Sequence, residues 1–152
     1  KTPLCKQGVQ TVVDRAAIVA EARTWIGTRF HHQARLKGVG VDCAGVVMGT
    51  AQNLGLFAED VQGYARHPDG GQLETECARQ MVQIPIADAQ AGDVLLFKFD
   101  AEPQHLAIIG DYVHGGLSII HAYSVARKVV ETRLDDTWRS RITAAYKLKG
   151  LI

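Results

Sequence analysis

The spacing of apolar residues changes near the middle of the chain. In the first half, apolar positions recur every three or four residues, as on one face of a helix, and in the second half they alternate or form short runs, as in strands. The first pattern predicts helices at residues 11–25, 43–53 and 72–82. The second predicts strands at residues 93–99, 105–109, 117–123, 125–133 and 142–148. Helices followed by a strand meander predict an α+β domain, in which an antiparallel sheet of about five to six strands covers the second helix.

The first predicted helix has both a start signal and a stop signal. Residues Thr11 to Asp14 resemble a capping box, and Gly27 follows the last apolar position. The apolar face of this helix comprises Ile18, Ala22, Trp25 and Ile26. Residues 1–11 are expected to form an extended lead-in, because a proline and a glycine interrupt the helical spacing there.

The length and charge of the chain limit its class. A chain of 152 residues without an internal repeat or linker predicts a single domain over residues 1–152. The formal net charge is +1 and no basic run occurs, so we expect no nucleic-acid partner. No apolar run approaches the roughly 18–20 residues that span a bilayer, and no charged-then-apolar leader opens the chain. We therefore expect a soluble protein with no membrane insertion and no signal peptide in the given chain.

The stretch from Gly38 to Thr50 joins a glycine-rich loop to the start of the second predicted helix. Asp42 is suited to the N-cap, and Cys43 takes the first helical position. Amide groups at a helix N-terminus and a neighbouring imidazole can lower a thiol pKa from its usual ~8.5 by several units, and only the thiolate attacks. Cys43 is therefore a candidate nucleophile, and the alternative is a buried structural cysteine.

The helix that follows Cys43 has one apolar face, which would place the cysteine at the inner edge of the core. This face comprises Val46, Val47, Thr50 and Leu54. Gly45 and Gly49 would allow another element to approach the helix closely.

A nucleophilic thiol needs a general base and a third group that holds the base. His105 and His121 each lie in a predicted strand. If the hairpin loop spans residues 112–116, Asp111 pairs with Leu117. This register places His121 on the same face as His105, about one pleat step away. A slip of one residue would move the two histidines to opposite faces, and the sequence leaves the register open.

Other interpretations of the cysteines and histidines remain possible. Cys43, His105 and His121 could hold a catalytic zinc ion, but no closely spaced pair of ligands is present, and we expect no metal and no cofactor. Cys5 and Cys77 could form a disulfide that leaves Cys43 free, or all three thiols could be reduced. The other histidines lie in polar or glycine-rich stretches and are expected at the surface: His31, His32, His67 and His114.

Residues 28–41 form a long connection that leads into the helix of Cys43. A connection of this length without regular structure is more often a binding loop than a simple linker. Its basic side chains are candidates to bind a substrate carboxylate: Arg29, Arg35 and Lys37.

Three motifs together resemble the NlpC-type cell-wall cysteine peptidases, a papain-like family. Residues 42–47 are similar to the family's Asp-Cys-Ser-Gly motif, residues 90–97 to its Pro-Gly-Asp-Leu strand, and residues 104–122 to its two-histidine hairpin. The resemblance covers residues 15–146 and implies the papain-like α+β fold, with the nucleophile helix packed on the sheet. It is strongest to the branch encoded with phage tails and gene-transfer agents, which has counterparts of residues 25–40.

The resemblance implies a role for each matching residue. Cys43 would be the nucleophile, His105 its base and then the acid for the leaving amine, and His121 the group that orients His105. The implied substrate is a peptidoglycan stem peptide, commonly cleaved between γ-D-glutamate and a diamino acid. The implied enzyme is a cysteine-type endopeptidase that works through an acyl-enzyme.

The expected substrate-binding residues are Asp42, Phe30, Arg35 and Lys37. Asp42 could bind a substrate ammonium in addition to its main role as an N-cap. Phe30 stands where the family usually has tyrosine, so the missing hydroxyl bears on substrate choice more than on catalysis. Ala44 replaces the common serine and leaves the backbone donors intact.

The resemblance also implies a phage tail-associated or prophage-encoded protein that acts at the bacterial cell wall or periplasm. Its expected partners are peptidoglycan stem peptides and phage tail proteins. Two other functions remain open, because fold and triad do not determine the acceptor: an acyltransferase or deacylase using the same triad, and a non-catalytic tail or wall-binding module.

Overall fold

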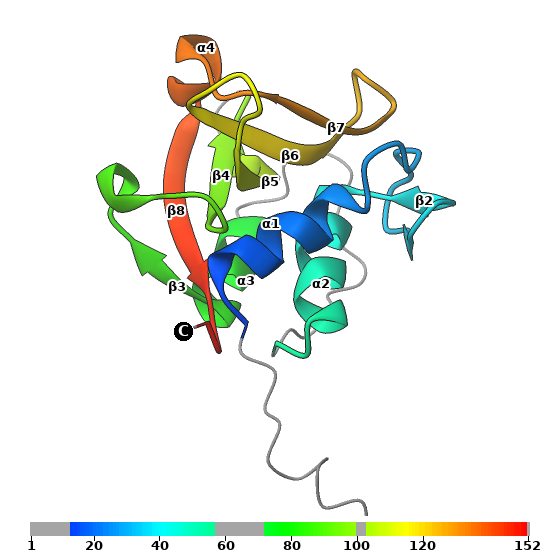
Figure 1. The fold of residues 1–152 in the computed structure, drawn as a ribbon, viewed down its shortest axis with the longest axis horizontal. Helices are drawn as coiled ribbons and strands as arrows, with labels where there is room; N and C mark the ends of the chain where they lie inside the picture. The colour runs from blue at the N-terminus through cyan, green and yellow to red at the C-terminus, as the bar shows by residue number, and fades with distance from the viewer. Residues whose placement is uncertain (1–12, 57–71, 100–102, 152) are drawn as a thin grey trace, which may run out of the picture.

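The computed structural model describes residues 13–56, 72–99 and 103–151 of the chain (Figure 1). The helices within these ranges are α1 (Arg15–Arg23), α2 (Cys43–Asn53), α3 (Gln72–Gln80), the short 3-10 helix η2 (Ile86–Asp88) and α4 (Asp136–Arg139). The strands are β1 (Arg35–Leu36), β2 (Gly40–Val41), β3 (Met81–Ile84), β4 (Val94–Lys98), β5 (Pro103–Asp111), β6 (Leu117–Tyr123), β7 (Lys128–Arg133) and β8 (Ile142–Leu148). The lead-in predicted for residues 1–11 lies outside the described residues.

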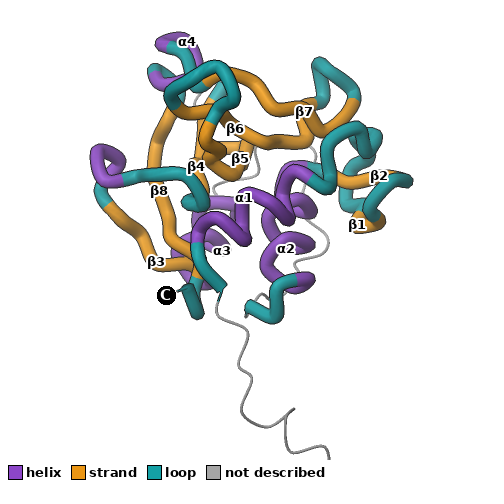
Figure 2. The backbone as a smooth tube through the Cα atoms, viewed as in Figure 1, coloured by secondary structure: helices purple, strands orange, loops and turns teal. Residues whose placement is uncertain are grey.

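The main sheet has six antiparallel strands in the order β3-β8-β4-β5-β6-β7. Figure 2 shows that α1, α2 and α3 gather on one side of this sheet. The predicted α+β class, with helices before an antiparallel sheet and the helix of Cys43 packed against it, is confirmed. Within the described ranges, no helix combines the length and the apolar character that a membrane crossing requires.

Side chains on the two faces of the sheet enter two separate apolar clusters. Leu106 and Ile120 belong to the cluster shared with the helices. Ala107 and Ile119, which point to the other face, belong to a second cluster with Trp138 of α4. The β5–β6 hairpin is therefore covered on both faces, and a side chain on either face can be buried.

Helix α2 begins and ends where the sequence predicts. Its N-cap is Asp42, whose side chain accepts a hydrogen bond from the Gly45 amide at 2.9 Å. A Cβ atom on Gly49 would collide with the indole ring of Trp25. Glycine at this position therefore lets the turn after α1 lie directly against α2, as predicted.

Helix α1 begins later than the capping box at Thr11 predicts, so that prediction is wrong. The N-cap is Asp14, which accepts a hydrogen bond from the Ala17 amide at 2.8 Å. The prediction that Ile26 faces the core is also wrong, because this side chain is 45% exposed. Since α1 ends at Arg23, the turn that follows no longer keeps the helical spacing.

The third predicted helix ends two residues early, at Gln80. The next residues form strand β3, which pairs with β8 so that Met81 lies opposite Leu148. The helical spacing of residues 72–82 does not indicate that a strand elsewhere in the chain has an unpaired edge. The edge of β8 provides hydrogen-bond partners, and this tertiary pairing decides the conformation after Gln80.

Two further boundaries differ from the prediction. The connection at residues 28–41 has regular structure, because β1 and β2 form a small antiparallel pair with Arg35 opposite Val41. The strand predicted from residue 125 begins at Lys128, after a turn in which Arg127 has a φ of 64°. Short pairs and tight turns of this kind are decided by local backbone geometry more than by apolar spacing.

Candidate active site

The β5–β6 hairpin brings His105 and His121 together. Asp111 pairs with Leu117, as the predicted hairpin loop requires. Nε2 of His105 lies 2.7 Å from Nδ1 of His121, which is hydrogen-bond distance. The predicted register, with both histidines on one face, is confirmed.

Aromatic side chains enclose this histidine pair. Tyr123 stacks on His121 with the ring centroids 5.2 Å apart, and Trp138 meets the same ring edge-on at 5.1 Å. The ring of Phe99 lies 5.4 Å from that of His105. His105 is 5% exposed and His121 is 0% exposed. The pair therefore lies in an apolar surrounding that holds both rings in position.

Burial lowers the pKa of both imidazoles. For His121, loss of hydration lowers the pKa to about 4. For His105, burial and then the neighbouring His121 hold the pKa well below its usual range. At neutral pH both rings are therefore uncharged, and each has one N–H donor and one nitrogen lone pair.

Thr132 lies on the other side of His121. Its Oγ1 is 3.2 Å from Nε2 of His121. In the pairing of β6 with β7, Thr132 is opposite Ile119 and Val130 is opposite His121, so Thr132 is a diagonal neighbour of His121 on the same face. A continuous line of contacts thus runs from His105 through His121 to the Thr132 hydroxyl.

Cys43 occupies the first position of α2 and approaches strand β5. The backbone N–H of Leu106, the residue after His105, donates toward the Cys43 sulfur, as does the N–H of Ala44. The nucleophile candidate therefore touches the backbone of the strand that carries the base candidate. The N-terminus of a helix and a strand from the second half of the chain form this part of the site together.

The thiol of Cys43 is protonated at neutral pH. Desolvation of the sulfur and then the nearby Asp42 carboxylate raise the pKa of Cys43 to about 12, although two backbone amides and the Arg35 charge act in the opposite direction. The lowered thiol pKa predicted from the helix N-terminus is therefore wrong for this structure, because burial outweighs the amides. In the part of the chain that the structure describes, no hydrogen bond joins the thiol to His105. The site thus holds a neutral thiol and a neutral imidazole pair.

Asp42 is 2% exposed and makes several structural contacts. Besides capping α2 through Gly45, its carboxylate accepts hydrogen bonds from the Gln33 amide at 2.7 Å and from Nη1 of Arg35 at 2.8 Å. The contact with Gln33 supports a backbone φ of 60°, which is uncommon outside glycine. The predicted capping role is confirmed, and Asp42 also joins the preceding loop to the helix.

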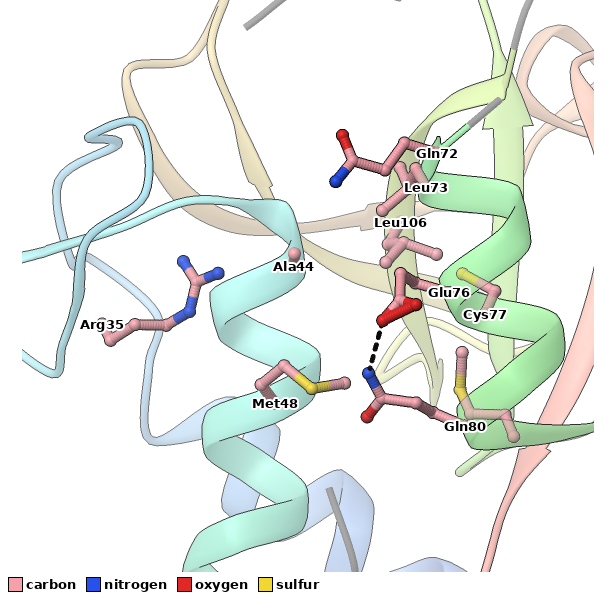
Figure 3. A pocket seen from close by; sticks show the side chains of 10 residues that line it. Arg35, Ala44, Met48, Gln72, Leu73, Glu76, Cys77, Gln80 and Leu106 are labelled. Atoms are coloured by element: carbon pink, nitrogen blue, oxygen red, sulfur yellow. Dashed lines mark hydrogen bonds between the residues drawn. The ribbon is translucent and has the colours of Figure 1, made fainter. Parts of the chain in front are cut away.

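A small pocket of about 30 Å³ lies between α2 and α3 (Figure 3). Its lining is mainly apolar and includes Met48, Leu73 and Leu106, and Arg35 approaches it from β1. Because Leu106 also contacts Cys43 through its backbone, the pocket is adjacent to the thiol.

The structure brings Arg35 to this region but directs Lys37 elsewhere. Arg35 lines the pocket and binds Asp42. Nζ of Lys37 lies 2.7 Å from a carboxylate oxygen of Glu21 and 5.2 Å from the ring centroid of Trp25. The Lys37 side chain therefore points to α1 and the turn that follows it.

Phe30 is half-buried and packs against the apolar cluster that Cys43 also contacts. Its backbone amide bonds the Arg127 carbonyl at 2.9 Å, which ties the loop before the nucleophile to the end of the sheet. The position is compatible with the predicted place beside the site, and its part in substrate binding stays a prediction.

The other histidines lie away from the histidine pair or outside the described residues. His31 and His114 are exposed, as predicted. His32 is half-buried, with its Nδ1 at 4.0 Å from Asp42, so the surface prediction is only partly right for this residue. His67 lies outside the described residues.

The structure also bears on the disulfide and zinc alternatives. Cys43 and Cys77 are free thiols, and Cys5 lies outside the described residues. Among the residues that the structure describes, no group of three or more His, Cys, Asp or Glu side chains could hold a metal ion. A shared zinc ion would need His105 and His121 to face one point, whereas here a nitrogen of each ring faces the other ring.

Three contributors to the site escaped the sequence analysis: the Leu106 amide, the Thr132 hydroxyl and the Trp138 ring. A backbone donor has no signature in the identity of its side chain. Alternation along β7 could have placed Thr132 on the face of His121, but only with the β6–β7 register known. Trp138 lies in α4, a helix of four residues that has too few turns to show a helical period.

Comparison with known proteins places the chain in a family. A model described as the NlpC/P60 family matches residues 26–147. The NlpC/p60 domain of the peptidoglycan hydrolase SagA is 26% identical with a TM-score of 0.62, and the match covers 90% of this chain and 100% of that one. The comparison with curated protein sequences finds no match.

Two further solved structures share the fold at lower identity. NlpC2 from Trichomonas vaginalis is 16% identical with a TM-score of 0.67, and the match covers 93% of this chain and 49% of that one. The peptidoglycan hydrolase RipB from Mycobacterium tuberculosis is 18% identical with a TM-score of 0.60, and the match covers 97% and 71%. This chain thus spans about half the length of NlpC2 and all of the SagA domain. Because the family model covers most of its length, the chain belongs to the NlpC/P60 family.

Proposed function

We propose that this protein is a cysteine peptidase that hydrolyses peptidoglycan stem peptides through an acyl-enzyme on Cys43. The main support for the proposal is one arrangement of residues. The Cys43 sulfur accepts a hydrogen bond from the backbone amide of Leu106, and His105, the preceding residue, is hydrogen-bonded to the buried His121. A thiol, a base and a group that orients the base are the parts that nucleophilic acyl transfer needs.

The proposed reaction begins from the neutral thiol. As the Cys43 sulfur bonds to the substrate carbonyl carbon, the thiol proton moves to His105, and backbone amides near the sulfur stabilise the oxyanion. The carbon–nitrogen bond then breaks, and the leaving amine takes that proton. Water attacks the thioester with His105 as base, and the collapse releases a carboxylic acid and restores the Cys43 thiol.

The bond that we propose for cleavage joins γ-D-glutamate to the diamino acid of the stem peptide. Two solved relatives are described as peptidoglycan hydrolases, which supports peptidoglycan as the substrate. We assign substrate contacts to Asp42, Phe30 and Arg35, as predicted from the sequence, and not to Lys37, whose ammonium binds Glu21 of α1. Arg35 has the best support of the three, because it lines the pocket beside α2, the helix of the nucleophile.

We also propose that the protein acts at the bacterial cell wall as part of a phage tail or a prophage-encoded system. The support is the likeness of residues 25–40 to the phage-tail and gene-transfer-agent branch. Phage tail proteins are the partners that this proposal implies, and binding of the purified chain to isolated tails would test it separately from catalysis.

Digestion of purified peptidoglycan tests the proposed reaction. Products are labelled at new amino groups and identified by mass spectrometry. A free amine on the diamino acid and a new γ-carboxyl on D-glutamate support the proposal. A product in which an added amine or alcohol replaces water supports acyl transfer instead, and complete absence of cleavage by the full chain contradicts the proposal.

A further inference from the structure

We infer that Thr132 is a positioning residue that selects the proton arrangement of His121 and so keeps the basic nitrogen of His105 free for the thiol. This inference rests on the proposed function, because it concerns the same histidine pair. It adds a fourth member to the line Cys43, His105 and His121, at a position that does not touch the reacting atoms.

The geometry provides a single path of contacts. Nε2 of His105 is 2.7 Å from Nδ1 of His121, and Nε2 of His121 is 3.2 Å from Oγ1 of Thr132. The first contact uses Nε2 of His105, so Nδ1 is the nitrogen left to act as base. The second contact uses the remaining nitrogen of His121, which is completely buried.

The proton positions in this path depend on one another. A neutral imidazole has one N–H, so a basic Nδ1 on His105 requires the proton on its Nε2. That N–H must donate to His121, whose Nδ1 must therefore be the acceptor. The proton of His121 is then on Nε2, where the Thr132 oxygen accepts it.

The opposite arrangement would disable the base. If His121 carried its proton on Nδ1, it would donate to Nε2 of His105, and the proton of His105 would shift to the nitrogen that the thiol needs. A threonine hydroxyl can accept a hydrogen bond from Nε2 of His121 or donate one to it, and we assign Thr132 the accepting role. In that role it provides the partner of the buried N–H in the productive arrangement, and a buried N–H without a partner is costly. Tyr123 and Trp138 enclose the His121 ring and limit access of water as a substitute for the hydroxyl.

Replacement of the hydroxyl tests the inference. Thr132→Val keeps the branched shape and removes the acceptor, and Thr132→Ser keeps the hydroxyl. We expect kcat of Thr132→Val on a defined muropeptide to fall roughly 10- to 100-fold with little change in KM, and Thr132→Ser to stay within about threefold of the wild type. Thr143→Val is the matched control: Thr143 is a half-buried strand threonine whose hydroxyl bonds the Leu96 carbonyl at 3.2 Å, and this variant should keep wild-type kcat.

A measurement of the ring protons decides the same point without turnover. In protein labelled with ¹⁵N-histidine, ring nitrogen shifts report which nitrogen carries the proton, and His121→Gln identifies the His121 signals. We expect His121 to be protonated at Nε2 in the wild type and to shift toward Nδ1 in Thr132→Val. A wild-type His121 protonated at Nδ1, or an unchanged tautomer together with wild-type kcat in Thr132→Val, overturns the inference. If the wild type cleaves no muropeptide, the proposed function fails, and the ring protons still decide the role of Thr132.

Discussion

Nε2 of His105 and Nδ1 of His121 lie 2.7 Å apart on one face of the sheet, and the His121 ring is fully buried. The contact leaves Nδ1 of His105 as the nitrogen available to a thiol. It exists because the β5–β6 hairpin has one particular register, which makes strand pairing part of the proposed chemistry.

The base itself provides the first prediction. His105→Gln should lower kcat on a muropeptide by about 10²- to 10⁴-fold, the usual contribution of a general base, and should leave the fold intact. Steady-state kinetics and circular dichroism measure the two effects. His114→Gln, in the exposed hairpin loop, is the control and should keep full activity. Equal activity of His105→Gln and His114→Gln would exclude His105 as the base.

The pH dependence of turnover follows from the two shifted groups. Because the pKa of His105 is held well below its usual range, the basic form persists at mildly acidic pH. Because the pKa of Cys43 is raised to about 12, the thiol stays protonated across the neutral and mildly alkaline range. We therefore expect kcat/KM to be flat from pH ~6.5 to ~9 and to fall only below the usual histidine range. An acidic limb centred at pH ~6.5 or above would contradict a neutral resting pair.

Stability should also depend on pH through the buried histidines. His121 has its pKa lowered to about 4 in the folded protein, so between pH ~6.5 and 4 the unfolded chain binds a proton that the folded protein does not. The contribution of His121 to the free energy of unfolding is therefore fully present above pH ~6.5. It is lost on acidification, which lowers the free energy of unfolding by about 3 kcal/mol. Urea unfolding at several pH values measures the slope.

His121→Gln tests the assignment of that slope. The substitution removes the titrating ring, so the dependence of unfolding free energy on pH should decrease by nearly one proton over the same range. His114→Gln should leave the slope unchanged, because this histidine is exposed. A slope that is the same in His121→Gln and the wild type would mean that other groups cause the acid sensitivity.

Two N-caps allow a matched test of what Asp42 contributes. Asp14 is exposed and caps α1 by accepting one hydrogen bond from the Ala17 amide at 2.8 Å. Asp14→Ala should therefore lower the free energy of unfolding by about 1 kcal/mol. Asp42 is buried and also holds Gln33 and Arg35, so Asp42→Ala should cost about 3 to 5 kcal/mol, because Arg35 loses its carboxylate partner. Chemical denaturation measures the free energy of unfolding of both variants. An equal decrease in the two variants would mean that Asp42 contributes no more to stability than an exposed N-cap.

Asp42→Asn separates the cap from the charge. Asparagine is as good an N-cap as aspartate, so helix α2 should keep its start while the ion pair with Arg35 is weakened. The free energy of unfolding should fall between those of the wild type and Asp42→Ala. A stability below that of Asp42→Ala would show that the amide is a poorer occupant of the site than a small side chain.

Local signals in the sequence were sufficient where a structural feature is itself local. The N-cap at Asp42, the start of α2 at Cys43 and the strand at residues 117–123 depend on neighbouring residues, and the structure has all three. The register that joins His105 to His121 could be stated as a condition on the hairpin loop, because a short loop determines the pairing on both sides of it.

Features that depend on distant parts of the chain were not predictable in this way. Strand β3 forms because β8 offers an edge, and residues 72–82 carry no sign of that edge. The contact of Thr132 with His121 needs the β6–β7 pairing. The pKa shift of Cys43 was predicted with the wrong sign, because the sequence indicates the helix N-terminus but not the loss of hydration around the sulfur of this half-buried residue.

Comparison of the wild type with Cys43→Ala on a single defined muropeptide decides whether Cys43 forms the acyl-enzyme during stem-peptide cleavage. The peptide contains one γ-D-glutamyl–diamino acid bond, products are quantified by mass spectrometry, and urea unfolding confirms that both proteins are folded. We expect the wild type to release the two fragments of that bond and Cys43→Ala to release none. Cleavage by folded Cys43→Ala at the wild-type rate would show that Cys43 is not the nucleophile.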